Sequence, residues 1–284
     1  MRLLFAVLLA LPVTLSATGL PSLRLSGGAR AAALAEAVTA LPDAQALNPA
    51  ALQSRGQSAA FSHATWIQGT RQDYLHLAWA RGQSVRGLSG QLWQTDDLER
   101  RTGPSTAPLG HFGVYEGAAG LSYARRMDRL RVGLRLNVIR QSISTDNASG
   151  ASADFGLIYA IDPRLHFGAS LRNLGSMGKL NRQATDLPLE ARLGAAYTGL
   201  TDLLITVEAQ QARDGDLTFH LGGEYHAGER LRLRTGYQHT ENRNLSAGLG
   251  LVTGRWIIDY AYVPFSSGLG DAHRITLLLE SPSL

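Results

Sequence analysis

Alternating charged residues are the feature of this sequence that comes nearest to a chemical site. Arginines and carboxylates recur inside otherwise apolar stretches, at Arg131, Arg135, Glu190, Arg192, Glu208, Glu224, Arg232, Arg234 and Asp259. Charges of this kind form cross-strand ion pairs when they fill a protein interior, or a permeation path when they line a channel. Because opposite signs alternate between neighbouring stretches, the sequence favours an ion-pair network over a charged path.

Motifs for catalysis and metal binding are missing from the sequence. It holds no His-Glu-x-x-His, Gly-x-Ser-x-Gly or phosphate-binding loop, and no cysteine. His220 and His226 share one face of a stretch, but roughly 20 Å of strand would separate them. The Arg-Asp-Gly-Asp run at 213–216 fits a hairpin turn better than a calcium loop. We therefore expect no enzyme activity, catalytic residue, metal or cofactor. The one alternative left is a catalytic Ser/His pair that follows no known motif.

The elements that carry these charges alternate apolar and polar residues. Leu130, Val132 and Leu134 fall on one face of such a stretch, and Arg131 and Arg135 fall on the other. This period of two predicts strands with one apolar face. About fourteen such stretches follow one another, and turn signals separate many of them, which predicts an all-β antiparallel meander. They cover roughly residues 57–67, 72–81, 84–95, 110–125, 129–144, 149–161, 164–173, 187–198, 202–212, 217–227, 230–239, 243–252, 254–263 and 271–280.

The length of the stretches separates a membrane barrel from a soluble sandwich. Strands of globular proteins usually have about 5–6 residues, whereas about 9–11 tilted residues cross a bilayer. The polar faces also carry arginine and glutamate in mid-strand, as the lumen of a barrel does. We therefore predict a transmembrane antiparallel β-barrel whose apolar face meets lipid. A secreted soluble barrel or sandwich is the alternative. Tyrosines and Trp256 near the predicted strand ends fit interfacial girdles, although aromatic residues favour strands in general.

The N-terminus has the pattern of an export signal. Arg2 precedes an apolar run at 3–15, and the small residues Ser16, Ala17 and Gly19 follow. This pattern predicts a cleaved secretory signal peptide over residues 1–19, with a buried helix as the alternative. We thus expect a protein that is exported to the outer membrane of a Gram-negative-type envelope.

Residues 20–55 differ from the rest because they are rich in alanine and poor in aromatic residues. Residues 31–41 predict a short helix, and Asn48, Pro49 and Ala50 predict a rigid turn. We expect this segment to be a small hatch inside a barrel formed by residues 56–284. We also expect polar contacts of Arg30, Glu36 and Asp43 with the lumenal charges to hold it.

Composition excludes several other classes. With 44% hydrophobic residues the chain is too apolar to be disordered. Its 27 basic and 23 acidic residues are dispersed, so it lacks the basic face of a nucleic-acid binder.

Four segments together resemble the PorV/PorQ family of outer-membrane proteins, within the FadL-like group of β-barrels. They are Gly-Ala-Arg-Ala at 28–31 with Asn-Pro-Ala at 48–50, Gly-Ala-Ser-Leu-Arg-Asn-Leu-Gly at 168–175, Leu-Pro-Leu at 187–189 with Arg-Leu-Gly-Ala-Ala-Tyr at 192–197, and Asp-Tyr-Ala-Tyr at 259–262 with Leu-Gly-Asp-Ala-His-Arg-Ile at 269–275. The chain departs from the family pattern at Leu34–Ala37, where the family has glycines, and at Ala51.

The resemblance implies a fourteen-stranded barrel with the Asn-Pro-Ala turn in a hatch. It implies passage of small hydrophobic molecules across the outer membrane, as in FadL-like proteins. The alternative that it implies is a PorV-like scaffold or shuttle for secreted cargo proteins of type IX secretion. A lipid-modifying barrel enzyme is a third class. The expected partners are outer-membrane lipid, a hydrophobic molecule or cargo protein, and the outer-membrane insertion machinery, but no nucleic acid.

Overall fold

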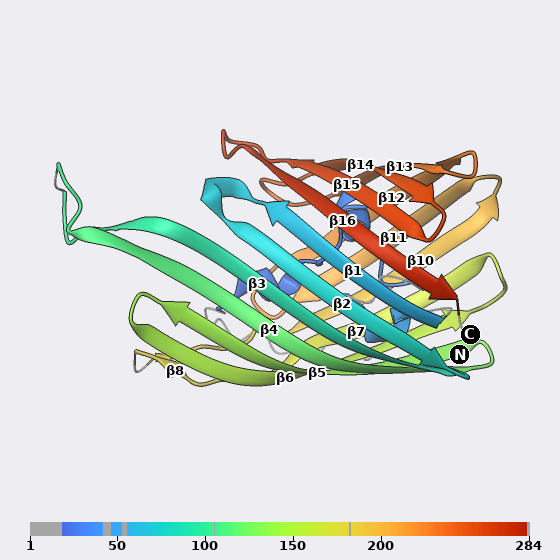
Figure 1. The fold of residues 1–284 in the computed structure, drawn as a ribbon, viewed down its shortest axis with the longest axis horizontal. Coiled ribbons are helices and arrows are strands. Elements are labelled where there is room, and N and C mark those ends of the chain that lie inside the picture. Colours follow the sequence, from blue (N-terminus) through green and yellow to red (C-terminus); the bar gives the residue numbers. More distant parts are fainter. Residues whose placement is uncertain (1–18, 42–46, 53–55, 105, 182, 283–284) are drawn as a thin grey trace.

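The strands of the chain close into one antiparallel barrel (Figure 1). The computed structural model describes all residues except 1–18, 42–46, 53–55, 105, 182 and 283–284. The first strand, β1 (Gly56–Thr65), pairs with the last, β16 (Asp271–Pro282), so the sheet has no free edge. The predicted all-β barrel of about fourteen strands is confirmed. The predicted signal peptide falls outside the described residues except for Gly19.

The observed strands follow the predicted stretches, although β3 and β7 continue past the predicted ends. Between β1 and β16 the barrel contains β2 Arg71–Arg81, β3 Ser84–Arg100, β4 Gly110–Met127, β5 Leu130–Ile143, β6 Asp146–Ala160, β7 Leu165–Met177, β10 Glu190–Leu200, β11 Leu203–Ala212, β12 Leu217–Ala227, β13 Leu231–Gln238, β14 Leu245–Thr253 and β15 Trp256–Pro264. The two-residue strands β8 (Lys179–Leu180) and β9 (Gln183–Ala184) pair only with each other. The short helices are η2 Pro21–Arg24, α1 Ala29–Ala33, η3 Pro49–Ala51 and η4 Ile67–Gly69.

Apolar side chains cover the outer face of the barrel. Six apolar residues of the predicted strands face outward and are 37–55% exposed, namely Leu134, Leu136, Phe167, Leu193, Leu231 and Ile258. Their neighbours Arg135, Arg192 and Arg234 are at most 7% exposed and point inward. An outward apolar band around a closed sheet is the arrangement of a transmembrane barrel. Among the described residues, no helix is long and apolar enough to cross a membrane.

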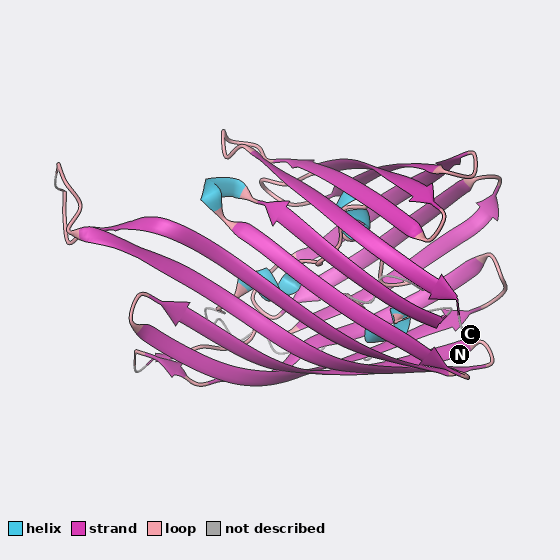
Figure 2. Ribbon diagram, viewed as in Figure 1, coloured by secondary structure: helices cyan, strands magenta, loops and turns pink. Residues whose placement is uncertain are grey.

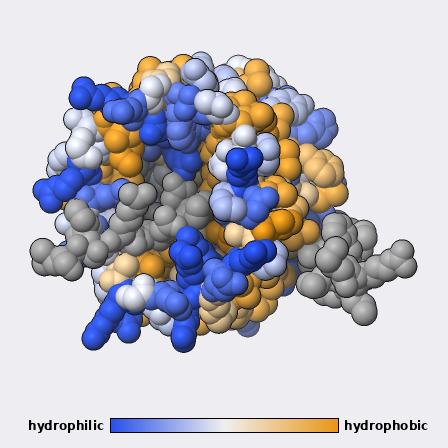
Figure 3. Space-filling model, turned by 90° about the vertical axis from the view of Figure 1, so that its right-hand side faces the viewer, coloured by the Kyte–Doolittle hydropathy of each residue, from blue (hydrophilic) through white to orange (hydrophobic). Residues whose placement is uncertain are grey.

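The two ends of the barrel differ in their connections. At one end, here named the short-turn end, the strands are joined by the segments 82–83, 128–129, 161–164, 201–202, 228–230 and 254–255. At the other, the loop end, longer segments such as 101–109 and 178–189 join them. Figure 3 looks onto the short-turn end and shows hydrophilic residues around much of its rim.

Aromatic residues form a girdle near each end of the barrel. Outward-facing residues near the short-turn end, each at least 36% exposed, are Trp79, Tyr123, Tyr159, Tyr197, Tyr225 and Trp256. Near the loop end the exposed residues are Tyr115, Tyr237 and Tyr262. Such rows mark the two membrane–water interfaces, as the sequence predicted.

Residues 19–41 and 47–52 run through the interior of the barrel, and Figure 2 shows their short helices among the strands. The predicted helix over 31–41 is wrong, because α1 ends at Ala33. The next turn contains Ala35 and Glu36 with φ values of 50° and 64°, which no α-helix allows. Bonds to the barrel wall stabilise this turn: Ala35 N donates to Ser246 Oγ at 3.1 Å, and Ala35 O lies 2.6 Å from His220 Nδ1. Tertiary contacts thus override the helix propensity of the alanines.

Candidate functional site

A buried ion-pair network crosses β7, β10 and β11 on the lumenal face. The Glu190 carboxylate accepts hydrogen bonds from Arg172 at 3.0 Å and from Arg192 at 2.6 Å. Arg192 also binds Glu208 at 2.6 Å. These side chains are at most 4% exposed. Neutralisation of each charge by a neighbour compensates part of the cost of its burial.

A second network lies on the strands that follow. Arg234 on β13 binds Glu224 at 2.6 Å and Asp259 at 2.5 Å. Arg135 on β5 binds Asp154 at 2.9 Å in a third group.

Arg131 and Arg232 lie near the short-turn end and are less buried than the charges of these networks. Arg131 lines a cavity at the mouth of the lumen. Arg232 is partly exposed and donates to the carbonyl oxygen of Gly228 at 3.1 Å. The structure thus brings the other predicted charges into buried groups, whereas these two arginines are only partly buried.

The N-terminal segment, meaning residues 19–41 and 47–52, takes part in both larger networks. Arg24 binds Glu190 at 3.3 Å, and Arg30 binds Glu224 at 2.7 Å. The backbone N–H of Thr39 donates to Glu208 at 2.9 Å. The carboxylates of the barrel wall therefore hold charged and backbone groups of the segment at the same time.

Glu36 forms contacts both within the segment and with the wall, because its backbone carbonyl oxygen accepts a hydrogen bond from Arg192 of β10 at 3.2 Å. Its carboxylate accepts hydrogen bonds from the backbone N–H of Ser26 at 3.1 Å and from Ser26 Oγ at 3.0 Å. Asp43, the third expected contact, falls outside the described residues.

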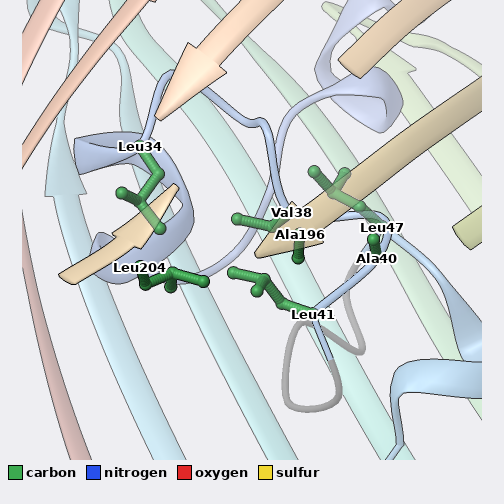
Figure 4. Close-up of a cluster of buried hydrophobic side chains, with 7 residues drawn as sticks. All are labelled: Leu34, Val38, Ala40, Leu41, Leu47, Ala196 and Leu204. Carbon is green, nitrogen blue, oxygen red and sulfur yellow. The ribbon is translucent and has the colours of Figure 1, made fainter. Parts of the chain in front are cut away.

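Apolar packing holds the same segment against the wall (Figure 4). Leu34, Val38 and Leu41 pack with Ala196 of β10 and Leu204 of β11 in a buried cluster. This apolar packing is added to the polar contacts that the structure shows. From the sequence, we expected only polar contacts, those of Arg30, Glu36 and Asp43. The alanines and leucines of the segment find apolar partners on lumenal positions of the strands.

The turn at residues 48–50 forms as predicted. The Asn48 side chain accepts a hydrogen bond from the Ala50 N–H at 2.9 Å. Its amide nitrogen donates to the carbonyl oxygens of Thr39 at 2.7 Å and Leu157 at 3.1 Å. Asn48 thus connects the turn to both the rest of the segment and β6, and η3 starts at Pro49.

Lumenal glycines were missed by the sequence reasoning, although they mark the course of the segment. A Cβ on Gly168 would lie 2.6 Å from Ala40 Cα, and a Cβ on Gly236 would lie 2.7 Å from Ala35 Cβ. Gly133 and Gly156 are in equally close contact with the turn at 48–50. Glycine in mid-strand indicates a close approach of another backbone, so its recurrence at inward positions is the signal that could have found this track.

A cavity of about 430 Å³ opens on the loop-end side of the segment. Its wall includes Pro21, Ser22, Arg24 and Leu25 of the segment, together with Trp66 and Trp93. The two indole rings meet edge to face at 5.7 Å, and the Arg243 guanidinium lies 5.6 Å from the Trp66 ring. Burial lowers the pKa of Arg243, which lies in the loop between β13 and β14, and the Glu36 carboxylate opposes that shift. We name this cavity the outer vestibule.

A second cavity, of about 460 Å³, lies at the short-turn end. Arg126, Arg131 and His166 contribute to its wall. Ile158 also lines it and packs against Ala50 and Ala51 of the segment. This inner vestibule and the outer vestibule therefore lie on opposite sides of the N-terminal segment.

No group of three or more His, Asp or Glu side chains that could hold a metal ion is found among the described residues. The arrangement can bind an apolar molecule against aromatic rings in the outer vestibule.

Comparison with known proteins gives a likeness in fold. No family model and no curated protein matches the chain. The structure is similar to the Pseudomonas putida toluene transporter TodX, with a TM-score of 0.69 and 11% identity over 90% of this chain and 99% of that one. It is also similar to a Pseudomonas aeruginosa FadL homologue, with a TM-score of 0.64 and 12% identity over 90% and 98% of the two chains. For the Ralstonia pickettii toluene transporter TbuX the TM-score is 0.62, at 12% identity over 89% and 96%. The chain thus has a FadL-like barrel fold, and the resemblance to the PorV/PorQ family rests on the four sequence segments alone.

Proposed function

We propose that the protein passes small hydrophobic molecules across the outer membrane. The observation that carries this proposal is the pair of vestibules inside one closed barrel, on either side of the N-terminal segment. The outer vestibule offers Trp66 and Trp93 to an apolar molecule, and aromatic surface binds such molecules by burial of area. The neighbours in fold named as toluene transporters support the same substrate class.

The orientation follows from the lengths of the connections. Outer-membrane barrels have short periplasmic turns and longer external loops. The short-turn end, with the inner vestibule, therefore faces the periplasm. The outer vestibule receives molecules from outside, and the N-terminal segment serves as the hatch between the two.

Entry of a hydrophobic dye that fluoresces in the inner membrane tests the proposal. We expect cells that produce the protein to take up the dye faster than cells without it. Val114→Trp, which fills the outer vestibule, should reduce the uptake. Leu121→Trp places the same ring on the lipid face, where Leu121 is 63% exposed, and should leave uptake unchanged. Equal uptake with and without the protein would refute transport.

A role as a scaffold for secreted cargo proteins is the second candidate. The hairpin of β3 and β4, strands of 17 and 18 residues, extends beyond the other strands at the loop end (Figure 1). Shortening this hairpin should abolish secretion of a cargo protein and leave dye uptake intact. Loss of dye uptake without any secretion defect would favour transport instead.

A further inference from the structure

Three arginines gather on the outer face of the barrel at the short-turn end. In the strand pairing of β2, β3 and β4, Ser84 lies opposite both Arg81 and Arg125. Arg86 lies opposite Trp79 and Tyr123, at the next outward-facing position along the strands toward the loop end. Figure 1 shows the three strands side by side over this region.

The register brings the three guanidinium groups within reach of one ligand. Residues directly opposite each other on neighbouring strands have Cβ atoms about 4.5–5.5 Å apart, and diagonal neighbours are about 7–8 Å apart. Arg81, Arg86 and Arg125 are all exposed, and an arginine side chain is long enough to cover such distances. The strand segments 75–81, 84–92 and 117–127 contain no Asp or Glu. The positive charge on this face is therefore not balanced by a carboxylate from these strand segments.

The surroundings of the arginines change from polar to apolar along the strands. Trp79 and Tyr123 flank Arg86 as part of the aromatic girdle, and Tyr123 Oη hydrogen-bonds Ser84 Oγ at 2.9 Å. The next outward row consists of Leu77, Leu88 and Leu121. A lipid presents the same succession, from charged headgroup to glycerol region to acyl chain.

The loop end offers a different pattern on these strands. Arg71 on β2 forms an ion pair with Asp96 on β3 at 2.6 Å. Arg71 is thus neutralised by a partner on the neighbouring strand, whereas the arginine group at the short-turn end is not.

We propose that Arg81, Arg86 and Arg125 form a binding site for the phosphate of an anionic phospholipid in the periplasmic leaflet. Guanidinium groups bind phosphate oxygens through paired, charge-assisted hydrogen bonds. The acyl chains of the lipid would lie on the row of leucines, and Trp79 and Tyr123 would pack against its glycerol region. The site rests on the barrel spanning the outer membrane with the short-turn end in the periplasm, and it is independent of what passes through the lumen.

Quenching of tryptophan fluorescence by brominated lipids tests the site. Trp79 and Trp256 are the exposed tryptophans, and they lie on different parts of the girdle. Trp256→Phe therefore leaves Trp79 to report on the proposed site, and Trp79→Phe leaves Trp256 as the matched control. The protein is placed in phosphatidylcholine vesicles that contain a minority of brominated phosphatidylglycerol or brominated phosphatidylcholine.

At Trp79 we expect a preference for phosphatidylglycerol that approaches about 100-fold, because each arginine near a membrane surface contributes about a factor of 5. At Trp256 the preference should be much smaller, because Glu229 and Glu280 lie beside Arg230 and Arg255 there, and the Glu280 N–H donates to the Arg255 carbonyl oxygen at 2.9 Å. The Arg81→Gln, Arg86→Gln, Arg125→Gln triple variant should remove the preference at Trp79. Replacing Arg164, Arg230 and Arg255, which lie in turns of the same end, by glutamine should preserve it.

Equal preferences at the two tryptophans of the otherwise unchanged protein would overturn the proposal without any arginine variant. Suppression of the preference by millimolar glycerol 3-phosphate would also overturn it, since the site would then bind a soluble phosphate. Dye uptake, measured on the triple variant, should equal that of the unchanged protein. A loss of uptake would contradict the independence of this site from transport.

Discussion

Substitutions at the lumenal glycines should displace the N-terminal segment without removing any charge. In a Gly168→Ala, Gly236→Ala double variant, each new Cβ would lie 2.7 Å or less from several main-chain or Cβ atoms of the segment. Carbon atoms in favourable contact are about 3.5–4.0 Å apart, so the overlap is close to 1 Å. The groups that overlap cannot rotate away, because they belong to the two backbones or are fixed to them.

The magnitude follows from overpacking. An extra methyl group in a tightly packed interior typically costs about 1–3 kcal/mol. Gly168 faces Thr39 and Ala40, whereas Gly236 faces Leu34 and Ala35, so the two costs should nearly add, to about 2–6 kcal/mol. Charge-assisted hydrogen bonds of the kind that hold the segment contribute about 1.5–3 kcal/mol each. The double substitution is therefore comparable with the loss of two such bonds.

Liposome swelling with small sugars is the assay, combined with trypsin cleavage after Arg24 and Arg30. The double variant should swell faster and be cut sooner than the unchanged protein. Gly90→Ala with Gly223→Ala is the matched control, because a Cβ meets nothing within 4 Å at Gly90 and only Thr235 at 3.9 Å at Gly223. If the double variant behaves like the control, the segment does not seat on these glycines. If only the double variant fails to fold, the segment is core structure and not a displaceable hatch.

The remaining predictions concern single positions and the whole segment. Leu193→Arg on the lipid face should lower the free energy of unfolding by about 2–4 kcal/mol. Arg192→Leu should lower it by about 3–5 kcal/mol, because Glu190 and Glu208 lose a partner. Urea unfolding in lipid compares the two variants, and no loss of stability for Leu193→Arg would contradict the assigned faces. Asn48→Ala should lower the free energy of unfolding by about 1–3 kcal/mol, because the N–H of Ala50 and the carbonyl oxygen of Thr39 lose their hydrogen bonds. It should also speed liposome swelling. An unchanged unfolding midpoint would show that Asn48 does not hold the turn. Deletion of residues 20–52 should leave a folded barrel with raised permeability, although less stable than the full protein, because Glu190 and Glu224 lose Arg24 and Arg30 and the apolar packing of the segment is lost as well. Heat-modifiable migration in gels and swelling rates measure both, and unchanged permeability would place the gate elsewhere.

The barrel wall was predictable from the sequence, whereas the interior was not. Lipid outside and a polar lumen inside impose a period of two on every strand, so the faces of Leu193 and Arg192 follow from their neighbours alone. The conformation of Ala35 and Glu36 depends on bonds to Ser246 and His220, which come from strands about 200 residues away in the chain. The local helix propensity of the alanines around those two residues predicts only a continuous helix.

The vestibules escaped prediction for a related reason. Trp66 and Arg243 lie in connections between strands, and only barrel closure brings them within 5.6 Å. The ion pairs were easier to predict, because Glu224 and Arg234 are direct cross-strand partners in a hairpin, and the turn sets the register of that hairpin. Arg131 and Arg232 show the limit of that reasoning, since strand alternation gives the face of a residue and not its depth in the lumen.

The seam between β1 and β16 has a consequence for the order of assembly. The N-terminal segment is synthesised before every strand, yet its partners include the last one: Ala29 N–H donates to Thr276 Oγ1 at 2.8 Å, and Arg274 donates to the Ser26 carbonyl oxygen at 2.8 Å. Both partners belong to β16, whose pairing with β1 completes the ring. Once β1 and β16 have paired, the segment can reach its position in the lumen only through an open end of the barrel. That passage is avoided by a folding route in which the segment binds to the sheet before the barrel closes, so that the last strands form around it. In such a route the segment acts as a template for closure, and the substitutions that loosen it would slow the final step of folding as well as open the lumen.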